Sequence, residues 1–255
     1  SNALKEFTKS DNPGLEIVFV SHDAANAGAQ RLLITLIEWL RDTKGIRPKI
    51  ILGHGGPLVP EFYQLGPVLE IDSLFSFNAE RTREKLLRFC GSSNSLLYIN
   101  TLVPGDVVGQ LSKLQIPLIT HVHELENAIK RWCVKDELEH LIGLTDHFIA
   151  ASPPVARNLE GAHQVPPEKI TMVYAFIKCQ KENGNSLDRI AIRRQQQLPE
   201  KGFIIFGCGT TDWRKGPDLF IGVADQANRL GLKDAYFFWI GSDTGELEEL
   251  QAKVR

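Results

Sequence analysis

The feature that most constrains the fold of this chain is the alternation of short apolar runs with helical stretches along most of its length. The first run, Ile17–Ser21, is typical of a buried strand, and Ala29–Arg41 follows it as a helix that is apolar over a broad face. Strands that alternate with helices across short loops pair in parallel, so the pattern predicts an α/β fold with helices on both faces of a parallel sheet. The further predicted strands are Lys49–Leu52, Val68–Ile71, Leu96–Ile99, Leu118–Thr120 and Phe148–Ala150, and the further predicted helices are Pro60–Leu65, Glu80–Phe89, Asp106–Leu114 and Glu124–Leu141.

A change of pattern near residue 165 indicates a second domain. A predicted strand, Ile170–Phe176, is followed by a polar stretch and then by a predicted helix over Ser186–Gln197. We therefore divide the chain into a tag remnant and N-terminal tail (1–14), a first domain (15–165), an interdomain passage (166–200) and the start of a second domain (201–255). The last part reads as strand Phe203–Phe206, helix Pro217–Leu230, strand Ala235–Ile240 and helix Gly245–Val254. Because two strands cannot close a doubly wound domain, we expect the second domain to be incomplete, either cut here or a natural fragment that needs a partner.

The composition excludes several classes of function. The 255 residues carry 29 basic and 31 acidic side chains, and this balance gives no support for a nucleic-acid partner. The four cysteines are widely scattered and form no CxxC pair, which favours reduced thiols over a zinc site or a disulfide framework. No apolar run approaches the roughly 20 residues that span a bilayer, and no secretory signal is present, so the cytoplasm is the expected compartment.

Three loops at the carboxyl ends of predicted strands carry the candidate sites, because ligands bind at that edge of an open parallel sheet. The first loop runs from Ser21 to Arg31 and is rich in small residues, which allow a substrate close to the backbone. We predict that Gly28, Ala29, Gln30 and Arg31 contribute to this site at the start of the first helix. A tight turn with no ligand is the alternative, and GxGxxG, the dinucleotide fingerprint, is missing.

The second loop is Thr120-His121-Val122-His123-Glu124, at the end of a predicted strand. Alternate strand residues point the same way, so His121 and His123 share a face in this prediction. With Glu124 they offer metal ligands or a general base, but HxH with one glutamate is weak evidence for zinc. We favour a neutral histidine that hydrogen-bonds a sugar or phosphate oxygen, and the alternative is one buried and one exposed structural histidine.

The third loop precedes the predicted helix at Pro217 and contains Arg214 and Lys215. Cations at a helix N-terminus are unfavourable unless an anion compensates, so the pair predicts an anion site that the helix dipole and its free N–H groups reinforce. The alternative is a solvated charge pair. The GxxxxGK[ST] motif of nucleoside triphosphatases is missing.

A basic stretch of the chain lies within the predicted helix Glu80–Phe89. It contains Arg81, Arg83, Lys85 and Arg88, with Glu80 and Glu84 interleaved. We interpret it as a solvated helix face, and peripheral contact with acidic lipid headgroups at the inner face of the membrane is the alternative.

At these residues the chain resembles the retaining GT-B glycosyltransferases of the GT4 type. The similarity runs in order from residue 15 to 255 and covers the loop Asn26–Arg31, the strand that ends in His123, the segment Asp146–Ser152, the segment Phe206–Asp218 and the strand Phe238–Gly241. Each motif is weak alone, and their order and spacing make the resemblance fairly specific. It implies a Rossmann-like first domain on the acceptor side and the start of a Rossmann-like second domain on the donor side.

The chain also departs from this family's pattern. The arginine that the family places just after the second glycine is Thr210 here, next to Gly209, so the usual arginine–lysine pair is altered and Arg214 is the candidate replacement. The family's E-x7-E region, which grips the donor, would lie beyond Arg255. The resemblance therefore implies that this chain is an inactive fragment by itself.

The resemblance implies transfer of a sugar, with retention, from a nucleotide-diphosphate sugar to a glycan or lipid-linked acceptor. Lys215 and Arg214 would stabilise the departing diphosphate, with Gly209 and Thr210 in the donor site, and His123 would hydrogen-bond the donor sugar. No metal or other cofactor is implied. A sugar-nucleotide epimerase of the same fold and a non-catalytic module that binds glycans or a partner are the rival hypotheses. The donor, the acceptor and the oligomeric state stay open.

Overall fold

The computed structural model describes two compact units. It describes residues 16–71, 79–91, 95–102, 114, 116–178, 188–243 and 252, and the chain divides into units 1–179 and 180–255. The predicted helices Asp106–Leu114 and Gly245–Val254 and the tail 1–14 lie almost entirely outside the described residues. Each unit is considered by itself below.

The first unit is built on one parallel sheet of seven strands in the order β3-β2-β1-β4-β5-β6-β7. The order reverses direction between the neighbours β1 and β4, and such a switch point is where open α/β sheets bind ligands. The strands are β1 (Glu16–Ser21), β2 (Arg47–Leu52), β3 (Val68–Glu70), β4 (Ser95–Ile99), β5 (Leu118–Val122), β6 (His147–Ala150) and β7 (Ile170–Met172).

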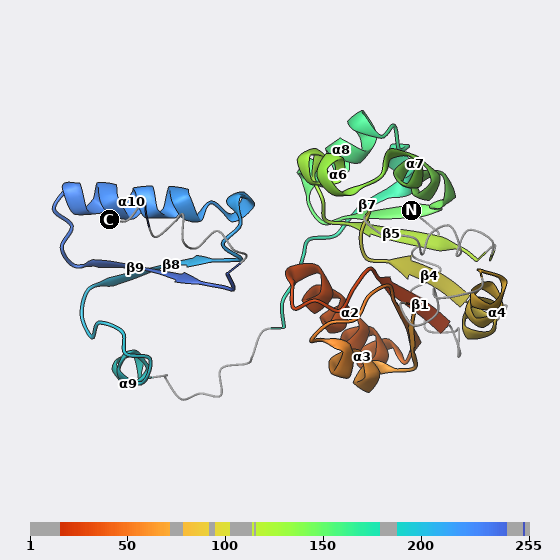
Figure 1. Ribbon diagram of the computed structural model, residues 1–255, viewed down its shortest axis with the longest axis horizontal. Coiled ribbons are helices and arrows are strands. Elements are labelled where there is room, and N and C mark those ends of the chain that lie inside the picture. Colours follow the sequence, from red (N-terminus) through yellow and green to blue (C-terminus); the bar gives the residue numbers. More distant parts are fainter. Residues whose placement is uncertain are drawn as a thin grey trace. The chain divides into compact units, whose positions relative to one another are not determined.

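Helices cover both faces of this sheet, as the sequence predicts. Figure 1 shows α2 (Gly28–Lys44) and α3 (Val59–Leu65) on one face, and α6 (Glu126–Trp132), α7 (Lys135–Leu144) and α8 (Pro153–Ala162) on the other. A further helix, α4 (Ala79–Cys90), precedes β4. The two faces bury separate apolar clusters, one around Phe19, Leu33 and Ile37 and the other around Val18, Leu97 and Phe148.

Strand pairing brings polar residues of different loops together at the carboxyl edge. In the parallel ladder Val20 pairs with Ile99, and Ile99 pairs with Thr120. The next residues, Ser21, Asn100 and His121, are buried, and by strand alternation they face the side that α2 covers. The loop after β1, the end of β4 and the end of β5 thus form one polar edge.

The second unit contains a two-stranded parallel sheet and the helix that connects its strands. β8 (Phe203–Cys208) pairs in register with β9 (Ala235–Ile240), and α10 (Pro217–Arg229) lies along one face (Figure 1). A short 3-10 turn, η3 (Trp213–Lys215), precedes α10. The helix α9 (Arg189–Gln195) begins at Asp188, whose carboxylate accepts hydrogen bonds from the N–H groups of Ile190 and Ala191.

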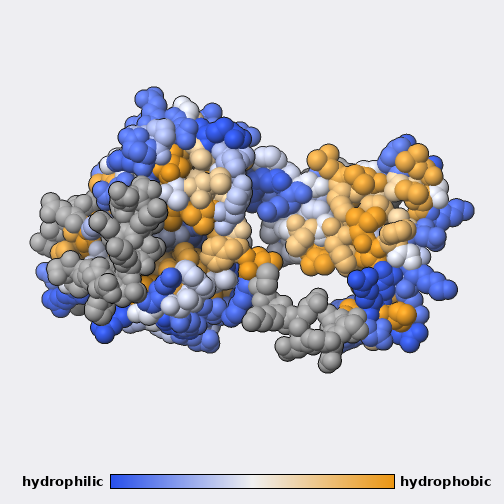
Figure 2. Space-filling view, turned by 180° about the vertical axis from the view of Figure 1, so that it is seen from behind, coloured by the Kyte–Doolittle hydropathy of each residue, from blue (hydrophilic) through white to orange (hydrophobic). Residues whose placement is uncertain are grey.

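Apolar side chains gather on the surface of this second unit, at the right of Figure 2. The exposed ones include Phe203, Phe206, Ile240, Leu219 and Val223. Its described residues bury few apolar side chains, whereas the first unit holds both apolar clusters.

The structure corrects the predicted helix Glu124–Leu141, which is two helices. Cys133 and Val134 are extended and separate α6 from α7, and the thiol of Cys133 donates a hydrogen bond to the carbonyl of Leu102 at 3.2 Å. This contact with the loop after β4, together with the β-branched Val134, favours the break. The carboxylate of Glu124 accepts hydrogen bonds from loop backbone, and α6 begins two residues later.

The strand predicted over Ile170–Phe176 is shorter, and the first unit is longer than expected. β7 ends at Met172 because its partner β6 ends at Ala150, after which only one further backbone bond forms, from Val173 to Ala150. Since β7 pairs with β6, the first unit extends past residue 165 to residue 179, into the first part of the passage expected over 166–200.

Candidate functional site

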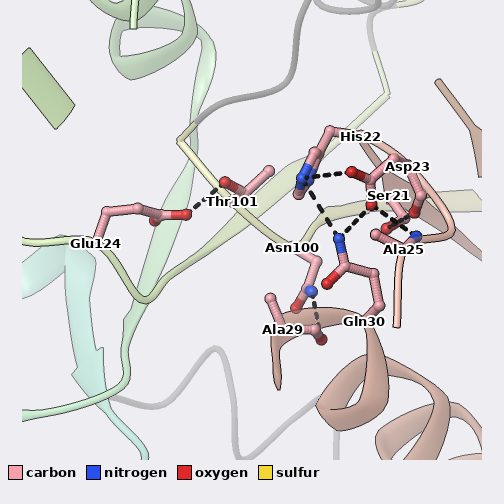
Figure 3. A network of polar contacts seen from close by, with 9 residues as sticks. All are labelled: Ser21, His22, Asp23, Ala25, Ala29, Gln30, Asn100, Thr101 and Glu124. Carbon is pink, nitrogen blue, oxygen red and sulfur yellow. Dashed lines mark hydrogen bonds and ion pairs between the residues drawn. The ribbon is translucent and has the colours of Figure 1, made fainter. Parts of the chain in front are cut away.

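The loop after β1 is organised around the carboxylate of Asp23. Its Oδ1 accepts hydrogen bonds from the backbone N–H of Ala25 at 3.0 Å and from the side-chain amide of Gln30 (Figure 3). Its Oδ2 lies 3.3 Å from Nε2 of His22. Burial raises the pKa of this carboxyl, but the hydrogen bonds from His22, Ala25 and Gln30 outweigh burial, so the pKa of Asp23 lies below its usual value.

Gln30 is held at the start of α2 with one polar atom unused. Its amide nitrogen bonds Asp23 and lies 3.4 Å from Nε2 of His22, while its Oε1 is buried and makes no hydrogen bond to any residue that the structure describes. A buried carbonyl oxygen without a partner is costly, so this atom is suited to accept a hydrogen bond from a ligand.

The other residues predicted for this loop have different surroundings. Gly28 is exposed, and the carbonyl of Ala29 accepts a hydrogen bond from Asn100 at 2.9 Å. The guanidinium of Arg31 pairs with Glu61 of α3 at 2.7 Å and with Asn26 at 2.8 Å. Arg31 thus ties α2 to α3 and to the loop, and its charge is already matched.

His121 at the end of β5 is a buried neutral histidine. Its Nδ1 lies 2.7 Å from the hydroxyl of Tyr98, and its Nε2 makes no hydrogen bond to a described residue. Burial, and then the charge of His123, lowers the pKa of His121 to about 3. If the Tyr98 hydroxyl donates to Nδ1, the ring carries its hydrogen on Nε2, and this N–H is the one group of the pair without a described partner. If instead Nδ1–H donates to Tyr98, both Nε2 and the hydroxyl proton of Tyr98 lack a described partner. We therefore assign Tyr98 as the donor.

His123 follows on the same face, and its ring centroid lies 4.1 Å from that of His121. Its Nε2 is 3.3 Å from Oδ1 of Asn100. Burial lowers the pKa of His123, and the nearby Glu124 offsets only part of this effect, so the ring is neutral near pH 7. The lowered pKa agrees with a neutral ring, and its hydrogen bond to a sugar or phosphate oxygen stays a prediction.

Glu124 is occupied with organising the loops. Its carboxylate accepts a hydrogen bond from the hydroxyl of Thr101 (Figure 3). It also accepts hydrogen bonds from the N–H of Leu102 at 3.4 Å and from the N–H of His123 at 3.1 Å. It joins the loop after β4 to the loop after β5, so its geometry suits a structural role better than that of a general base.

In the second unit, Lys215 crosses the backbone of Gly209. Gly209 has φ +147°, and a Cβ there would lie 2.9 Å from Cγ and 3.0 Å from Cδ of Lys215. The carbonyl of Gly209 accepts a hydrogen bond from the indole of Trp239 at 2.9 Å, which fixes the glycine from β9. No described residue forms an ion pair or hydrogen bond with the Lys215 ammonium.

Arg214 differs from Lys215 because it is paired. Its Nε lies 3.0 Å and its Nη2 3.4 Å from the carboxylate of Asp212, which also accepts a hydrogen bond from the hydroxyl of Thr210. Burial raises the pKa of Asp212, but the bonds from Arg214 and Thr210 outweigh it, so this pKa is lowered. Thr210 and Arg214 are therefore linked through one carboxylate.

Lys215, which has no partner among the described residues, stands just before α10. Gly216 takes the left-handed conformation with φ +67° and no side chain caps the helix, whose first residue is Pro217. The free N–H groups of the first turn and the helix dipole favour an anion here. The loop can therefore accept an anion next to Lys215, and the anion site itself stays a prediction.

No cluster of three metal-binding side chains occurs among the residues that the structure describes. Across those same residues, no helix is long and apolar enough to cross a bilayer. Of the basic stretch, Arg88 forms an ion pair with Glu84 at 3.8 Å, while the side chains of Arg81 and Arg83 lie outside the described set.

Sequence reasoning missed Asn100, Tyr98 and Asp23. Asn100 directly follows the predicted strand Leu96–Ile99, so the rule that ligands meet the carboxyl ends of parallel strands was a signal for it. The contact of Tyr98 with His121 depends on which strands are neighbours, and that order is not visible in the sequence. The contacts of Asp23 are local, to His22, Ala25 and Gln30, so its place in the first predicted loop was a signal for it.

Comparison with protein families and solved structures gives the wider context. The model of "Glycosyltransferase Family 4" matches residues 26–181. No curated protein matches the sequence. Among solved structures, HepE from Anabaena in complex with UDP and glucose is 17% identical with a TM-score of 0.69, and the match covers 94% of this chain and 66% of that one.

Two further structures bear on the alternatives. A glycosyltransferase from Rickettsia africae is 16% identical with a TM-score of 0.67, and the match covers 95% of this chain and 64% of that chain. A UDP-GlcNAc 2-epimerase from Methanocaldococcus jannaschii is 13% identical with a TM-score of 0.54, covering 94% and 68%. At such identities the likeness shows the fold alone. This chain spans about two thirds of the length of these neighbours.

Proposed function

Because the chain belongs to Glycosyltransferase Family 4, we propose that it takes part in the transfer of a sugar from a nucleotide-diphosphate sugar to a glycan or lipid-linked acceptor, with retention. The observation that carries this proposal is Lys215, whose aliphatic stem crosses Gly209 just before α10 and whose ammonium has no ionic partner among the described residues. HepE, which shares the fold, is described in complex with UDP and glucose.

Lys215 would bind the diphosphate and stabilise the charge that develops on it as the bond to the anomeric carbon breaks. A preorganised cation and helix N–H groups do this without reorganising in the reaction, which is why such groups contribute strongly to catalysis. Arg214 would contribute less than the sequence suggests, because Asp212 already neutralises much of its charge. Gly209 and Thr210 would shape the same site through Lys215 and Asp212.

In the first unit, His123 would hydrogen-bond the donor sugar as a neutral ring. Gly28, Ala29 and Gln30 would line the acceptor side, where the unpaired Oε1 of Gln30 can accept a hydrogen bond from an acceptor hydroxyl. The ring of His121 packs beside that of His123 and would help to hold the His123 ring in place.

An epimerase of the same fold is the rival enzyme. Epimerisation needs a side chain that exchanges a proton with a sugar carbon, and a carboxylate with free oxygens is the natural candidate. At the edge of the first sheet, the carboxylates of Asp23 and Glu124 each accept at least two hydrogen bonds. This geometry favours the transferase.

The test combines binding and turnover. We expect Lys215→Ala to lower the turnover of the full-length enzyme by about 100-fold or more, the order found when one charge-stabilising group is removed. Calorimetric titration of UDP, GDP and ADP sugars against the 255-residue chain should show which nucleotide binds and that Lys215→Ala weakens it. Lys233→Ala, an exposed lysine after α10, is the matched control. Near-normal turnover of Lys215→Ala would contradict the proposed role of Lys215 in stabilising the departing diphosphate.

A further inference from the structure

Asn100 connects the start of α2 to the histidine at the end of β5. Its side-chain nitrogen donates to the carbonyl of Ala29 at 2.9 Å, and its side-chain oxygen lies 3.3 Å from Nε2 of His123. Asn100 itself is 2% exposed and follows the buried strand β4, so its amide is held in one place by packing and by its two partners.

The carbonyl of Ala29 decides which way the Asn100 amide points. A carbonyl oxygen only accepts hydrogen bonds, so the amide nitrogen must face it, and a flipped amide would set two acceptors against each other. The amide oxygen is then the atom that faces His123. Because this oxygen also only accepts, Nε2 of His123 must carry the hydrogen.

The proton on Nε2 leaves Nδ1 of His123 as a hydrogen-bond acceptor, since burial keeps the ring neutral. No described residue hydrogen-bonds Nδ1. A neutral imidazole in this tautomer accepts a hydrogen bond there, and it offers no donor from that atom to a ligand carbonyl or phosphate oxygen.

We propose that Asn100 is a positioning residue that fixes His123 as the Nε2–H tautomer, so that Nδ1 accepts a hydrogen bond from a hydroxyl group of the sugar substrate. The hydroxyl part of this inference rests on the proposed function, and the positioning part does not. The recognised chemical class is a hydroxyl that donates, because an oxygen without a hydrogen would face the lone pair of Nδ1.

Two substitutions separate this role from a purely structural one. Asn100→Asp is isosteric, keeps an acceptor for Nε2–H of His123 and loses the donor to Ala29. Asn100→Leu loses both. If Asn100 only tied α2 to the sheet, the two variants would behave alike. Asn158→Leu, which removes a half-buried amide on α8 that donates to Glu126, is the matched control.

The direct readout is the position of the proton on the ring of His123, measured by imidazole proton–nitrogen correlation spectra of the 255-residue chain and assigned with His123→Gln. We expect a protonated Nε2 in the parent chain, in Asn100→Asp and in Asn158→Leu. In Asn100→Leu we expect a detectable Nδ1–H form and exchange of the Nε2 proton with water about tenfold faster or more, because its acceptor is gone.

The kinetic readout is the pH profile of the full-length enzyme. A carboxylate at position 100 raises the pKa of His123 and so protonates Nδ1 as the pH falls. The charged groups already beside His123 are Glu124 and, if protonated, His121. We therefore expect Asn100→Asp to lose kcat at low pH and recover it at high pH, while Asn100→Leu loses at least about tenfold at every pH with KM little changed.

The outcomes decide the inference whether or not each variant folds. A parent chain with the proton on Nδ1, or an Asn100→Asp variant with an unchanged His123 pKa, overturns it. If Asn100→Leu does not fold, these two results still stand. The predicted spectra in the 255-residue chain, together with a full-length enzyme that transfers sugar from no nucleotide sugar, would support the positioning role and overturn the proposed function instead.

Discussion

At the scale of single residues, the polar edge of the first sheet contains buried polar atoms that make no hydrogen bond to a described residue. Asp23 and Glu124 have their oxygens engaged, whereas Oε1 of Gln30 and Nε2 of His121 are buried without a described partner. Native proteins satisfy most buried polar atoms, so such exceptions mark positions where a ligand or water completes the network. The candidate site of the first unit is therefore made of oriented neutral groups. The second unit, considered by itself, offers the ammonium of Lys215, which has no ionic partner among the described residues.

Gly209 is predicted to act through Lys215. A Cβ at position 209 would push Cγ and Cδ of the lysine aside, and φ +147° strains any residue other than glycine. We expect Gly209→Ala to weaken nucleotide binding about as much as Lys215→Ala and to destabilise the chain by about 1 kcal/mol or more. Calorimetric titration with the best-bound nucleotide measures the first effect and urea unfolding the second.

The double variant shows whether the two residues act as one unit. Because both substitutions remove the same ammonium from the same place, their effects on binding should overlap, and Gly209→Ala should cost little once Lys215 is alanine. Gly231→Ala, at another left-handed glycine with open space around it, gives the backbone strain without the displaced lysine. Additive losses in the double variant would contradict the shared mechanism.

His121 is predicted to make the stability of the chain depend on pH. Its pKa is about 3 in the folded chain and about 6.5 when unfolded, so between these values only the unfolded chain takes up the proton. The free energy of unfolding therefore falls as the pH drops from about 6.5 toward 3, by up to about 1.4 kcal/mol per pH unit from this residue. In His121→Gln one proton fewer is taken up on unfolding, so the free energy of unfolding should depend less steeply on pH, by up to about 1.4 kcal/mol per pH unit.

Urea unfolding at pH 7, 6 and 5, analysed for the transition of the first unit, which contains His121, measures the slope. His140→Gln, an exposed histidine on α7, serves as the control and should leave the dependence close to that of the parent chain. An unchanged slope in His121→Gln would mean that His121 is accessible to protons in the folded chain.

At the scale of elements, the sequence predicts most of the first sheet. β1 and β4 of this sheet, and β9 of the second unit, lie within about a residue of their predicted bounds, because each is an apolar run between polar or glycine-containing loops. The family resemblance and the α/β class are confirmed as well. A run of apolar residues specifies a buried strand locally, so no knowledge of its neighbours is needed.

Other elements depend on contacts between distant segments and were not predictable. The break between α6 and α7 coincides with the bond from Cys133 to Leu102, which lies 31 residues away. The length of β7 is set by the end of β6. The pairing of Asn100 with His123 follows only when β4 and β5 are known to be neighbours, and this explains why the sequence identified the histidine and missed its partner.

At the scale of the whole molecule, the two units differ in how much apolar surface they bury. Seven paired strands and two apolar clusters support the first unit, whereas the described part of the second has two paired strands, α9 and α10. Isolated pairs of strands are marginally stable in water unless a helix or further strands cover them. Phe203, Phe206 and Ile240 stay exposed on β8 and β9.

This difference predicts unequal protection from hydrogen exchange. Amides with few buried contacts around them open by local unfolding at low free energy, so β8 and β9 should exchange faster than β1, β4 and β5. Hydrogen–deuterium exchange of the 255-residue chain, read on peptides from both units, measures this. We expect the amides of β1 to open with a free energy that approaches that of global unfolding. The protection factors of β8 should be at least about tenfold lower than those of β1. Saturating nucleotide should raise the protection of β8 and the start of α10, because binding to the Lys215 site stabilises the folded second unit, and should do so far less in Lys215→Ala. Equal protection of β1 and β8 without ligand would show that the second unit is as stable as the first despite its smaller core.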